Sequence, residues 1–135
     1  MQQPPGFREG NTDTVCLLHR SLYGLKQAPR AWYARLSEEL HKLGFSASDA
    51  DPALFIRNTN GVQVYLLAYV DDCLLAAPEG NTAVLDDIIA ALQRSFDMKD
   101  MGEPSVFLGM EISRDRERHE RLHLHSGRRL RHLVQ

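Results

Sequence analysis

The stretch Val62–Ala77, "VQVYLLAYVDDCLLAA", is apolar except for two adjacent aspartates, Asp71 and Asp72. The apolar runs on either side favour two strands, Val62–Val70 and Cys73–Ala77, joined by a tight hairpin turn. Aspartate tolerates turn backbone, so the pair can be a simple turn. Two neighbouring negative charges repel, however, and a divalent cation held between them and a phosphate would lower that cost. Spacing alone leaves both interpretations open.

The segments around this stretch alternate between strand and helix signals. "DPALFIR" reads as a strand, and the turn residues "NTNG" predict that the chain returns as a hairpin. After the loop "PEGN", Asn81 or Thr82 can cap a helix that runs to about Phe96. The apolar residues of that helix recur at helical spacing: Val84, Leu85, Ile88, Ile89, Leu92 and Phe96.

Upstream, "KQAPRAWYARLSEELHKLGF" predicts another helix, with Pro29 in its first turn and Gly44 as its C-terminal stop. One apolar stripe follows its surface: Trp32, Leu36, Leu40 and Leu43. "VCLLHRSLYGL" begins as a strand and breaks at Gly24, whereas "MKDMGEP" reads as a turn. "SVFLGMEISRD" and "RLHLHS" predict strands joined by the charged tip "RERHE", and "GRRLRHLVQ" predicts the start of a helix. This order predicts an α+β fold with two helices on one face of an antiparallel sheet.

Composition fits one soluble domain. The chain has 135 residues, of which 43% are hydrophobic and 25% charged, and no apolar run reaches the roughly 18 residues of a membrane span. The N-terminus lacks a signal-peptide pattern, so we expect a cytoplasmic or nuclear protein without membrane contact. Cys16 and Cys73 have no metal-ligand spacing and are expected to be reduced.

The net charge of −2 hides an uneven distribution. Five Lys or Arg face two Glu in residues 19–45, three basic residues face ten acidic ones in 47–110, and seven Arg face four acids in 111–135. Basic segments flanking an acidic middle can form a phosphate-binding surface around a metal centre. An ordinary mixed, solvated surface explains the same distribution.

Several motifs together resemble one family. "YVDD", Tyr69 to Asp72, resembles the catalytic hairpin of reverse transcriptases, and "SLYGLKQAPRAWY" resembles the nucleotide-pocket segment of the copia-type LTR-retrotransposon branch. "FDMKDMGEPSVFLGMEISRD" is similar to that branch's following turn and primer-grip strands, while "DPALFI" and "QPPGF" fit in order and spacing. The resemblance covers nearly the whole chain, so residues 1–135 are expected to be one reverse transcriptase palm segment with a ferredoxin-like sheet.

The resemblance also implies roles for individual residues. Asp71 corresponds to the metal-binding aspartate, Asp72 to its supporting ligand, and Tyr69 to the residue against the primer end or incoming nucleotide. The implied nucleotide and template pocket comprises Gly24, Lys26, Gln27 and Pro29, and the implied primer-grip hairpin comprises Phe107, Leu108 and Gly109. The implied cofactor is Mg²⁺, and the implied partners are an RNA or DNA template-primer and a deoxynucleoside triphosphate.

Simpler interpretations stand beside these roles. Gly24 can merely break a strand, Lys26 can be a solvated cation, and Trp32 fits the apolar stripe of its helix. Leu108 and Gly109 can be a strand and its bulge. The six histidines show no ligand spacing and are expected at the surface.

The sequence also departs from the family's pattern. The family's palm has a further catalytic aspartate on a strand upstream of "QPPGF", which we expect to lie outside this chain together with the fingers, most of the thumb and RNase H. Near the C-terminus the family usually has Ser-Gln and then a Tyr, where this chain has His125, Ser126 and Arg129. We therefore expect no activity from the chain alone, and self-association through an unpaired strand edge. The alternative is a non-catalytic relic or a domesticated module that binds nucleic acid or a partner.

Overall fold

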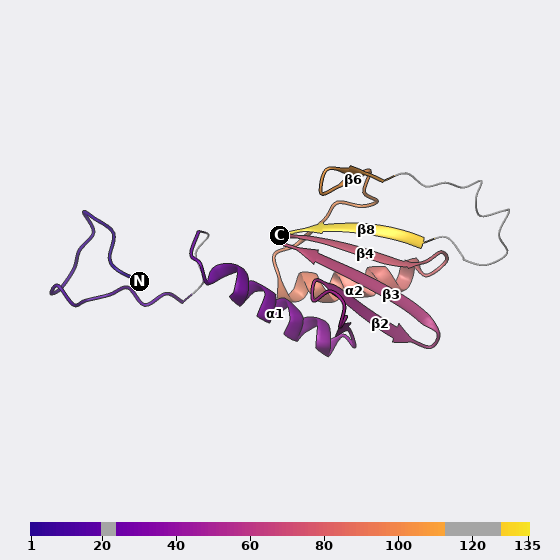
Figure 1. Cartoon of the computed structure of the whole chain (residues 1–135), viewed down its shortest axis with the longest axis horizontal. Coiled ribbons are helices and arrows are strands. Elements are labelled where there is room, and N and C mark those ends of the chain that lie inside the picture. The colour runs from indigo at the N-terminus through magenta and orange to yellow at the C-terminus, as the bar shows by residue number, and fades with distance from the viewer. Residues whose placement is uncertain (20–23, 113–127) are drawn as a thin grey trace. The chain divides into compact units, whose positions relative to one another are not determined.

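The computed structural model describes residues 1–19, 24–112 and 128–135, which fall into two compact units, Met1–Arg35 and Leu36–Gln135. Figure 1 labels the main elements along the chain. The helices and strands are α1 (Ala28–Lys42), β1 (Ser46–Ala47), β2 (Leu54–Thr59), β3 (Val62–Tyr69), β4 (Asp72–Pro78), α2 (Thr82–Ser95), β5 (Lys99–Asp100), β6 (Val106–Phe107), β7 (Met110–Glu111) and β8 (Arg128–Val134).

Among its described residues, 1–19 and 24–35, the first unit contains little regular structure before α1. An isolated bridge pairs Gln2 with Val15, and the N–H of Cys16 donates to the carbonyl of Met1 at 2.9 Å. The strand predicted to begin at Val15 is wrong for the described residues 15–19, because this bridge is not extended into a ladder. Leu17 is accordingly 81% exposed.

Helix α1 ends as the sequence predicts. Gly44 has a φ of +83°, the left-handed backbone that glycine adopts without steric cost. Its N–H donates to the carbonyl of His41 at 3.0 Å, and the N–H of Phe45 donates to the carbonyl of Leu40 at 2.9 Å. These two bonds form a Schellman motif, which satisfies carbonyls that the helix end would otherwise leave open.

The second unit is built on a six-stranded sheet with the order β1-β2-β3-β4-β8-β5, in which every neighbouring pair is antiparallel. The predicted hairpin between β2 and β3 is confirmed. Its two turn residues, Asn60 and Gly61, have φ values of +52° and +78°. Positive φ at both positions matches the tight hairpin turns that follow the twist of the strands.

The core lies between one face of this sheet and the helices. Burial alternates along β4, so that Cys73, Leu75 and Ala77 are buried, and α2 packs against this strand. The Ser95 hydroxyl of α2 donates to the Glu39 carboxylate of α1 at 3.2 Å. The α+β class with two helices and an antiparallel sheet is therefore confirmed. Within the described residues, no helix is long and apolar enough to cross a membrane.

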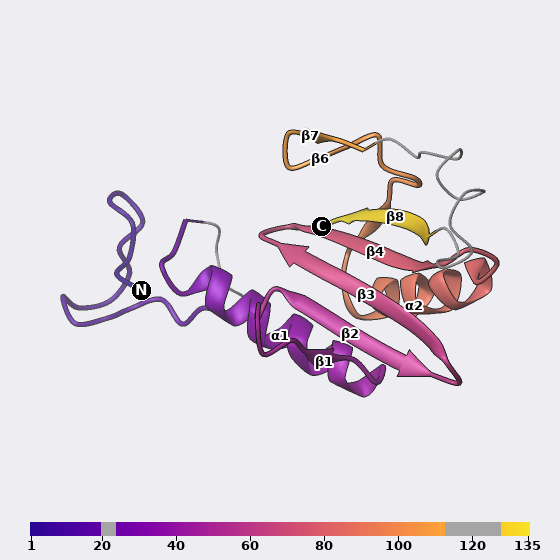
Figure 2. The same ribbon diagram turned by 45° about the vertical axis from the view of Figure 1, so that its right-hand side comes forward.

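The C-terminal segment differs from its predicted form. Residues 128–134 form strand β8, drawn in yellow in Figure 2, instead of the start of a helix. This strand pairs with β4 over seven residues and with β5 on its other side. The expected unpaired edge beside the aspartate hairpin is therefore also wrong, because β8 covers the outer edge of β4. The predicted strand at 121–126 and the charged tip at 116–120 lie outside the described residues.

The segment predicted as one strand from Ser105 onward is instead a tight hairpin. Strands β6 and β7 are joined by Leu108 and Gly109, whose φ values are +51° and +76°. The alternative of a strand with a bulge is wrong, because both residues turn the chain. Residues 113–115 of that predicted strand lie outside the described residues.

Candidate carboxylate site

The aspartate pair lies at the tip of the hairpin between β3 and β4. The turn residues are Val70 and Asp71, whereas Asp72 begins β4 and pairs with Tyr69 across the hairpin. The predicted hairpin is confirmed, but its turn lies one residue earlier than the predicted Asp71–Asp72. In the observed register Asp72 pairs with Tyr69 and Cys73 with Ala68, so Asp72 belongs to the strand and only Val70 and Asp71 turn the chain.

The tip of this hairpin is open to solvent. Tyr69 is 54% exposed, Val70 is 62% exposed, and Asp71 is also exposed. Val70 has a φ of +52°, which is unusual for a β-branched residue and costs about 1–2 kcal/mol. The pairing of β3 with β4 therefore holds the turn in a strained conformation, with Asp71 exposed at its tip.

Asp72 has a partner from the other end of the chain. Its Oδ1 atom lies 3.1 Å from Nε2 of His132 in β8. The ring of His132 also meets the ring of Phe107 edge-on, with centroids 5.5 Å apart and an interplanar angle of 90°. The N–H of Gln135 donates to the carbonyl of Asp71 at 3.0 Å. Strand β8 and the residue that follows it therefore contact the two aspartates.

The expectation that the histidines are surface residues is wrong for His132, whose side chain is only 19% exposed. Sequence reasoning missed it because the contact with Asp72 exists only if residues 128–134 form a strand beside β4. The helical spacing of this segment gave no signal for that pairing.

Cys73 lies directly behind the carboxylates on the buried face. Desolvation, with a smaller contribution from the negative charge of Asp72, raises the pKa of Cys73 to about 12. The reactive form of a thiol is its thiolate, so this residue is chemically inert near neutral pH. It contributes packing to the site and no nucleophile.

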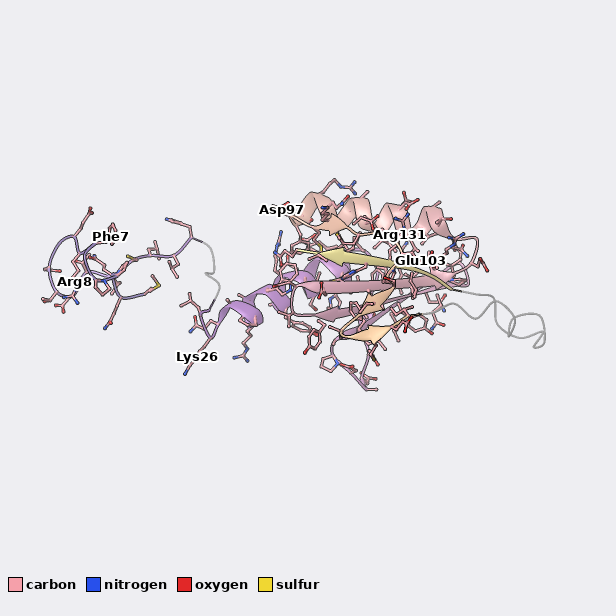
Figure 3. All side chains as sticks on the ribbon, turned by 90° about the horizontal axis from the view of Figure 1, so that it is seen from above. Phe7, Arg8, Lys26, Asp97, Glu103 and Arg131 are labelled. Atoms are coloured by element: carbon pink, nitrogen blue, oxygen red, sulfur yellow. The ribbon has the colours of Figure 1, made fainter. Side chains whose placement is uncertain are left out.

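The implied primer-grip residues reach the site in part. Phe107 is buried at 4% exposure and touches the site through His132, whereas Leu108 and Gly109 form the exposed turn beyond it. The implied pocket residues all belong to the first unit, where each is exposed: Gly24, Lys26, Gln27 and Pro29. Figure 3 labels Lys26 just before α1. The structure describes the positions of these four residues relative to the first unit.

The donors at the hairpin tip suit a hard cation. Carboxylate oxygens are preferred ligands of Mg²⁺, which commonly binds one or two carboxylates and keeps several waters. The exposed Asp71 and the half-exposed Asp72 fit one such ion. Across the described ranges 1–19, 24–112 and 128–135, no group of three or more His, Cys, Asp or Glu could hold a metal ion. The site thus offers the carboxylates of one hairpin.

Comparison with known sequences identifies the family. The family model for reverse transcriptase (RNA-dependent DNA polymerase) matches residues 1–126, and the chain belongs to this family. The resemblance to retrotransposon reverse transcriptases is thereby confirmed. No solved structure matches the chain.

Three curated relatives carry transposon names. A putative transposon Ty5-1 protein of Saccharomyces cerevisiae is 39% identical over 113 residues, covering 83% of this chain and 36% of the relative. The retrovirus-related Pol polyprotein from transposon RE2 of Arabidopsis thaliana is 41% identical over 115 residues, covering 84% of this chain and 8% of the polyprotein. The retrovirus-related Pol polyprotein from transposon TNT 1-94 of Nicotiana tabacum is 37% identical over 118 residues, covering 86% of this chain and 9% of the polyprotein. The chain thus spans about a third or less of these relatives.

Proposed function

We propose that this chain supplies the metal-binding carboxylate hairpin of a retrotransposon reverse transcriptase, an RNA-directed DNA polymerase. The observation that carries the proposal is the position of Asp71 and Asp72 at an exposed hairpin tip opposite Tyr69, within a family match over residues 1–126. The proposed substrates of the whole enzyme are an RNA or DNA template-primer and a deoxynucleoside triphosphate.

Each residue of the hairpin has a distinct role in this proposal. Asp71, held forward by the turn, is the principal metal ligand, and Asp72 at the start of β4 supports it. Tyr69 lies across from Asp72 and contacts the primer end or the incoming nucleotide. When bound, Mg²⁺ would stabilise the charge that develops during phosphoryl transfer. The proposed primer grip is Phe107, Leu108 and Gly109, and the proposed nucleotide and template pocket is Gly24, Lys26, Gln27 and Pro29.

The proposed fold is a polymerase palm with a ferredoxin-like arrangement, formed by residues 1–135. The antiparallel sheet with its helices supports this assignment, since β4 lies within the sheet and the two aspartates lie where β4 begins. Two-metal nucleotidyl transfer needs carboxylates from more than one strand to bridge the ions. Because the described residues offer those of one hairpin, we expect weak metal binding and no detectable DNA synthesis from this chain alone.

A chimaeric enzyme tests the proposal directly. Residues 62–78 of this chain would replace the corresponding hairpin of an active reverse transcriptase of the same family. We expect Mg²⁺-dependent extension of a primed RNA template by the chimaera, and its loss on Asp71→Asn. The matched control is Gln63→Asn near the far end of β3, within the transplanted residues, which should leave extension intact. An active Asp71→Asn chimaera would exclude the proposed role of this carboxylate.

The alternative is a non-catalytic module that binds nucleic acid through its basic residues. Lys26 and Arg30 are exposed in the first unit, but Arg131 is held by Asp86 and Asp100 and is less available to phosphate. Weak binding through basic residues should fall steeply with salt, because phosphate contacts release counterions. Salt-dependent RNA binding by a chain whose hairpin does not support extension in the chimaera would favour this alternative.

A further inference from the structure

Strand β8 brings a side chain to the carboxylate site from outside the family-matched residues. The match ends at residue 126, whereas β8 covers Arg128–Val134. We propose that His132 of this strand is a positioning residue that orients the Asp72 carboxylate for metal binding. The inference rests on the proposed metal-binding function of the hairpin and adds a residue to it.

The contact is directional. A carboxylate can only accept hydrogen bonds, so Nε2 of His132 carries the proton that it donates to Oδ1 of Asp72, 3.1 Å away. In the β4–β8 register, His132 lies opposite Leu74, and Asp72 is the next residue of β4 on the same face. The two side chains therefore lean toward each other across adjacent strands. A nitrogen that donates its proton here is not itself a metal ligand.

The imidazole is held before any metal arrives. The backbone N–H of His132 donates to the carbonyl of Gly102 at 2.9 Å, and its carbonyl accepts from the N–H of Met101 at 2.8 Å. The ring of Phe107 packs against the imidazole edge-on. The backbone bonds fix the position of His132 and the Phe107 ring packs against its imidazole, so this donor restricts the orientations of the Asp72 carboxylate that it binds.

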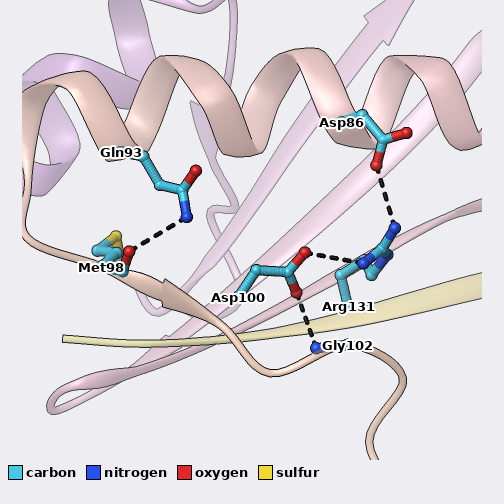
Figure 4. Close-up of polar contacts among 6 residues, drawn as sticks. All are labelled: Asp86, Gln93, Met98, Asp100, Gly102 and Arg131. Atoms are coloured by element: carbon cyan, nitrogen blue, oxygen red, sulfur yellow. Dashed lines mark hydrogen bonds and ion pairs between the residues drawn. The ribbon is translucent and has the colours of Figure 1, made fainter.

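The neighbours of His132 keep the strand in place. Leu133 is fully buried opposite Cys73. Figure 4 shows Arg131 reaching both Asp100, at 2.8 Å, and Asp86 of α2, at 3.1 Å. The carboxylate of Asp100 also accepts from the N–H of Gly102 at 2.8 Å. These contacts tie β8 to α2 and β5, so His132 sits on a secured strand.

Hydrogen-bonding partners of metal ligands typically change metal affinity by about 10–100-fold when they are removed. His132→Phe keeps an aromatic ring beside Phe107 but removes the donor. His132→Gln keeps a donor and should preserve most of the effect. His19→Phe, a change at an exposed histidine of the first unit, is the control. Urea unfolding without metal shows whether each variant remains folded.

The test titrates Mn²⁺ alone into the full chain and follows amide NMR signals, with the paramagnetic broadening of the Asp71 and Asp72 signals as the measured quantity. We expect His132→Phe to need about 10–100-fold more Mn²⁺ than the wild type, with His132→Gln much closer to it. Unchanged or tighter Mn²⁺ binding in folded His132→Phe overturns the positioning role of His132 and leaves the proposed metal site standing. Absence of hairpin-centred broadening in the wild type removes the proposed metal site, and this inference with it.

Discussion

Strand β4 has two antiparallel neighbours that are held in different ways. On one side, β3 is connected to it by the two-residue turn at Val70 and Asp71, so their pairing is local. On the other side, β8 comes from the C-terminal end of the chain and is held by Leu133 against Cys73 and by the ion pairs of Arg131. The β3–β4 pairing, here called the inner pairing, needs only a turn. The β4–β8 pairing, here called the outer pairing, depends on side-chain contacts made across the fold. Substitutions in β8 should therefore weaken the β4–β8 pairing without weakening the β3–β4 pairing.

The largest effect is expected from Leu133→Asp. This change places an unpaired charge in the core beside Cys73, where Leu133 is fully buried, and should cost about 3–5 kcal/mol. Release of β8 also exposes the edge of β4, which should favour self-association. Urea unfolding and sedimentation measure the two consequences.

Leu130→Asp is the matched control, because Leu130 lies in the same strand but is only half-buried and pairs with Ala76 in the row of His132. Leu130→Asp should lower the free energy of unfolding clearly less than Leu133→Asp does. If Leu133→Asp unfolds at the wild-type urea concentration and stays monomeric, the β4–β8 pairing does not hold the unit together.

A smaller loss is expected from Arg131→Leu. The guanidinium bonds two carboxylates, and its side chain is 28% exposed, so solvent weakens both ion pairs. The change should lower the free energy of unfolding by about 1–2 kcal/mol, and by less at high salt. Arg129→Leu, a change in the same row of β8, is the control. Equal losses for both variants, independent of salt, would show that the ion pairs do not secure β8.

The two pairings also differ in how far the sequence predicts them. The β3–β4 hairpin, α1 and α2 follow from local signals: apolar strands around a short turn, helical apolar spacing, and Gly44 after a helix. Strand β8 does not, because Leu130, Leu133 and Val134 have the i, i+3, i+4 spacing typical of a helix, and the tertiary contacts override it.

The candidate site divides in the same way. The sequence locates Asp71, Asp72 and Tyr69 at one hairpin to within one residue of the turn. It misses His132, whose contact with Asp72 depends on the long-range strand. The local strand signal also misses the turn at Leu108, because a bulky side chain with positive φ is rare, although the family resemblance implies a hairpin at these residues.

The reactivity of the Cys73 thiol measures whether β8 stays paired with β4. With a pKa of about 12 in the folded chain, the thiol should react very slowly with thiol reagents at pH 8, and quickly in Leu133→Asp if β8 is released. Unfolding restores an ordinary thiol pKa near 9, so the unfolded chain loses the proton first as pH rises. Stability should therefore fall above pH 9, by about 1 kcal/mol at pH 10, and this part should vanish in Cys73→Ala. Rapid labelling of Cys73 in the folded wild type would contradict its burial opposite Leu133 of β8.

The smallest expected effect lies in the turn of the inner pairing. Val70 has a φ of +52° and is 62% exposed, so Val70→Gly removes backbone strain and little packing. Relief of about 1–2 kcal/mol is partly offset by the 0.5–1 kcal/mol that glycine costs in unfolded-state entropy, so we expect a gain of about 0.5–1 kcal/mol. The reciprocal change, Gly61→Val, puts a β-branched residue at a φ of +78° in the β2–β3 turn and should destabilise the chain by at least as much. Urea unfolding of both variants compares two turns of the same length in one sheet. A loss of stability in Val70→Gly would mean that contacts of the valine side chain, and not the pairing of β3 with β4, hold the aspartate turn in its strained conformation.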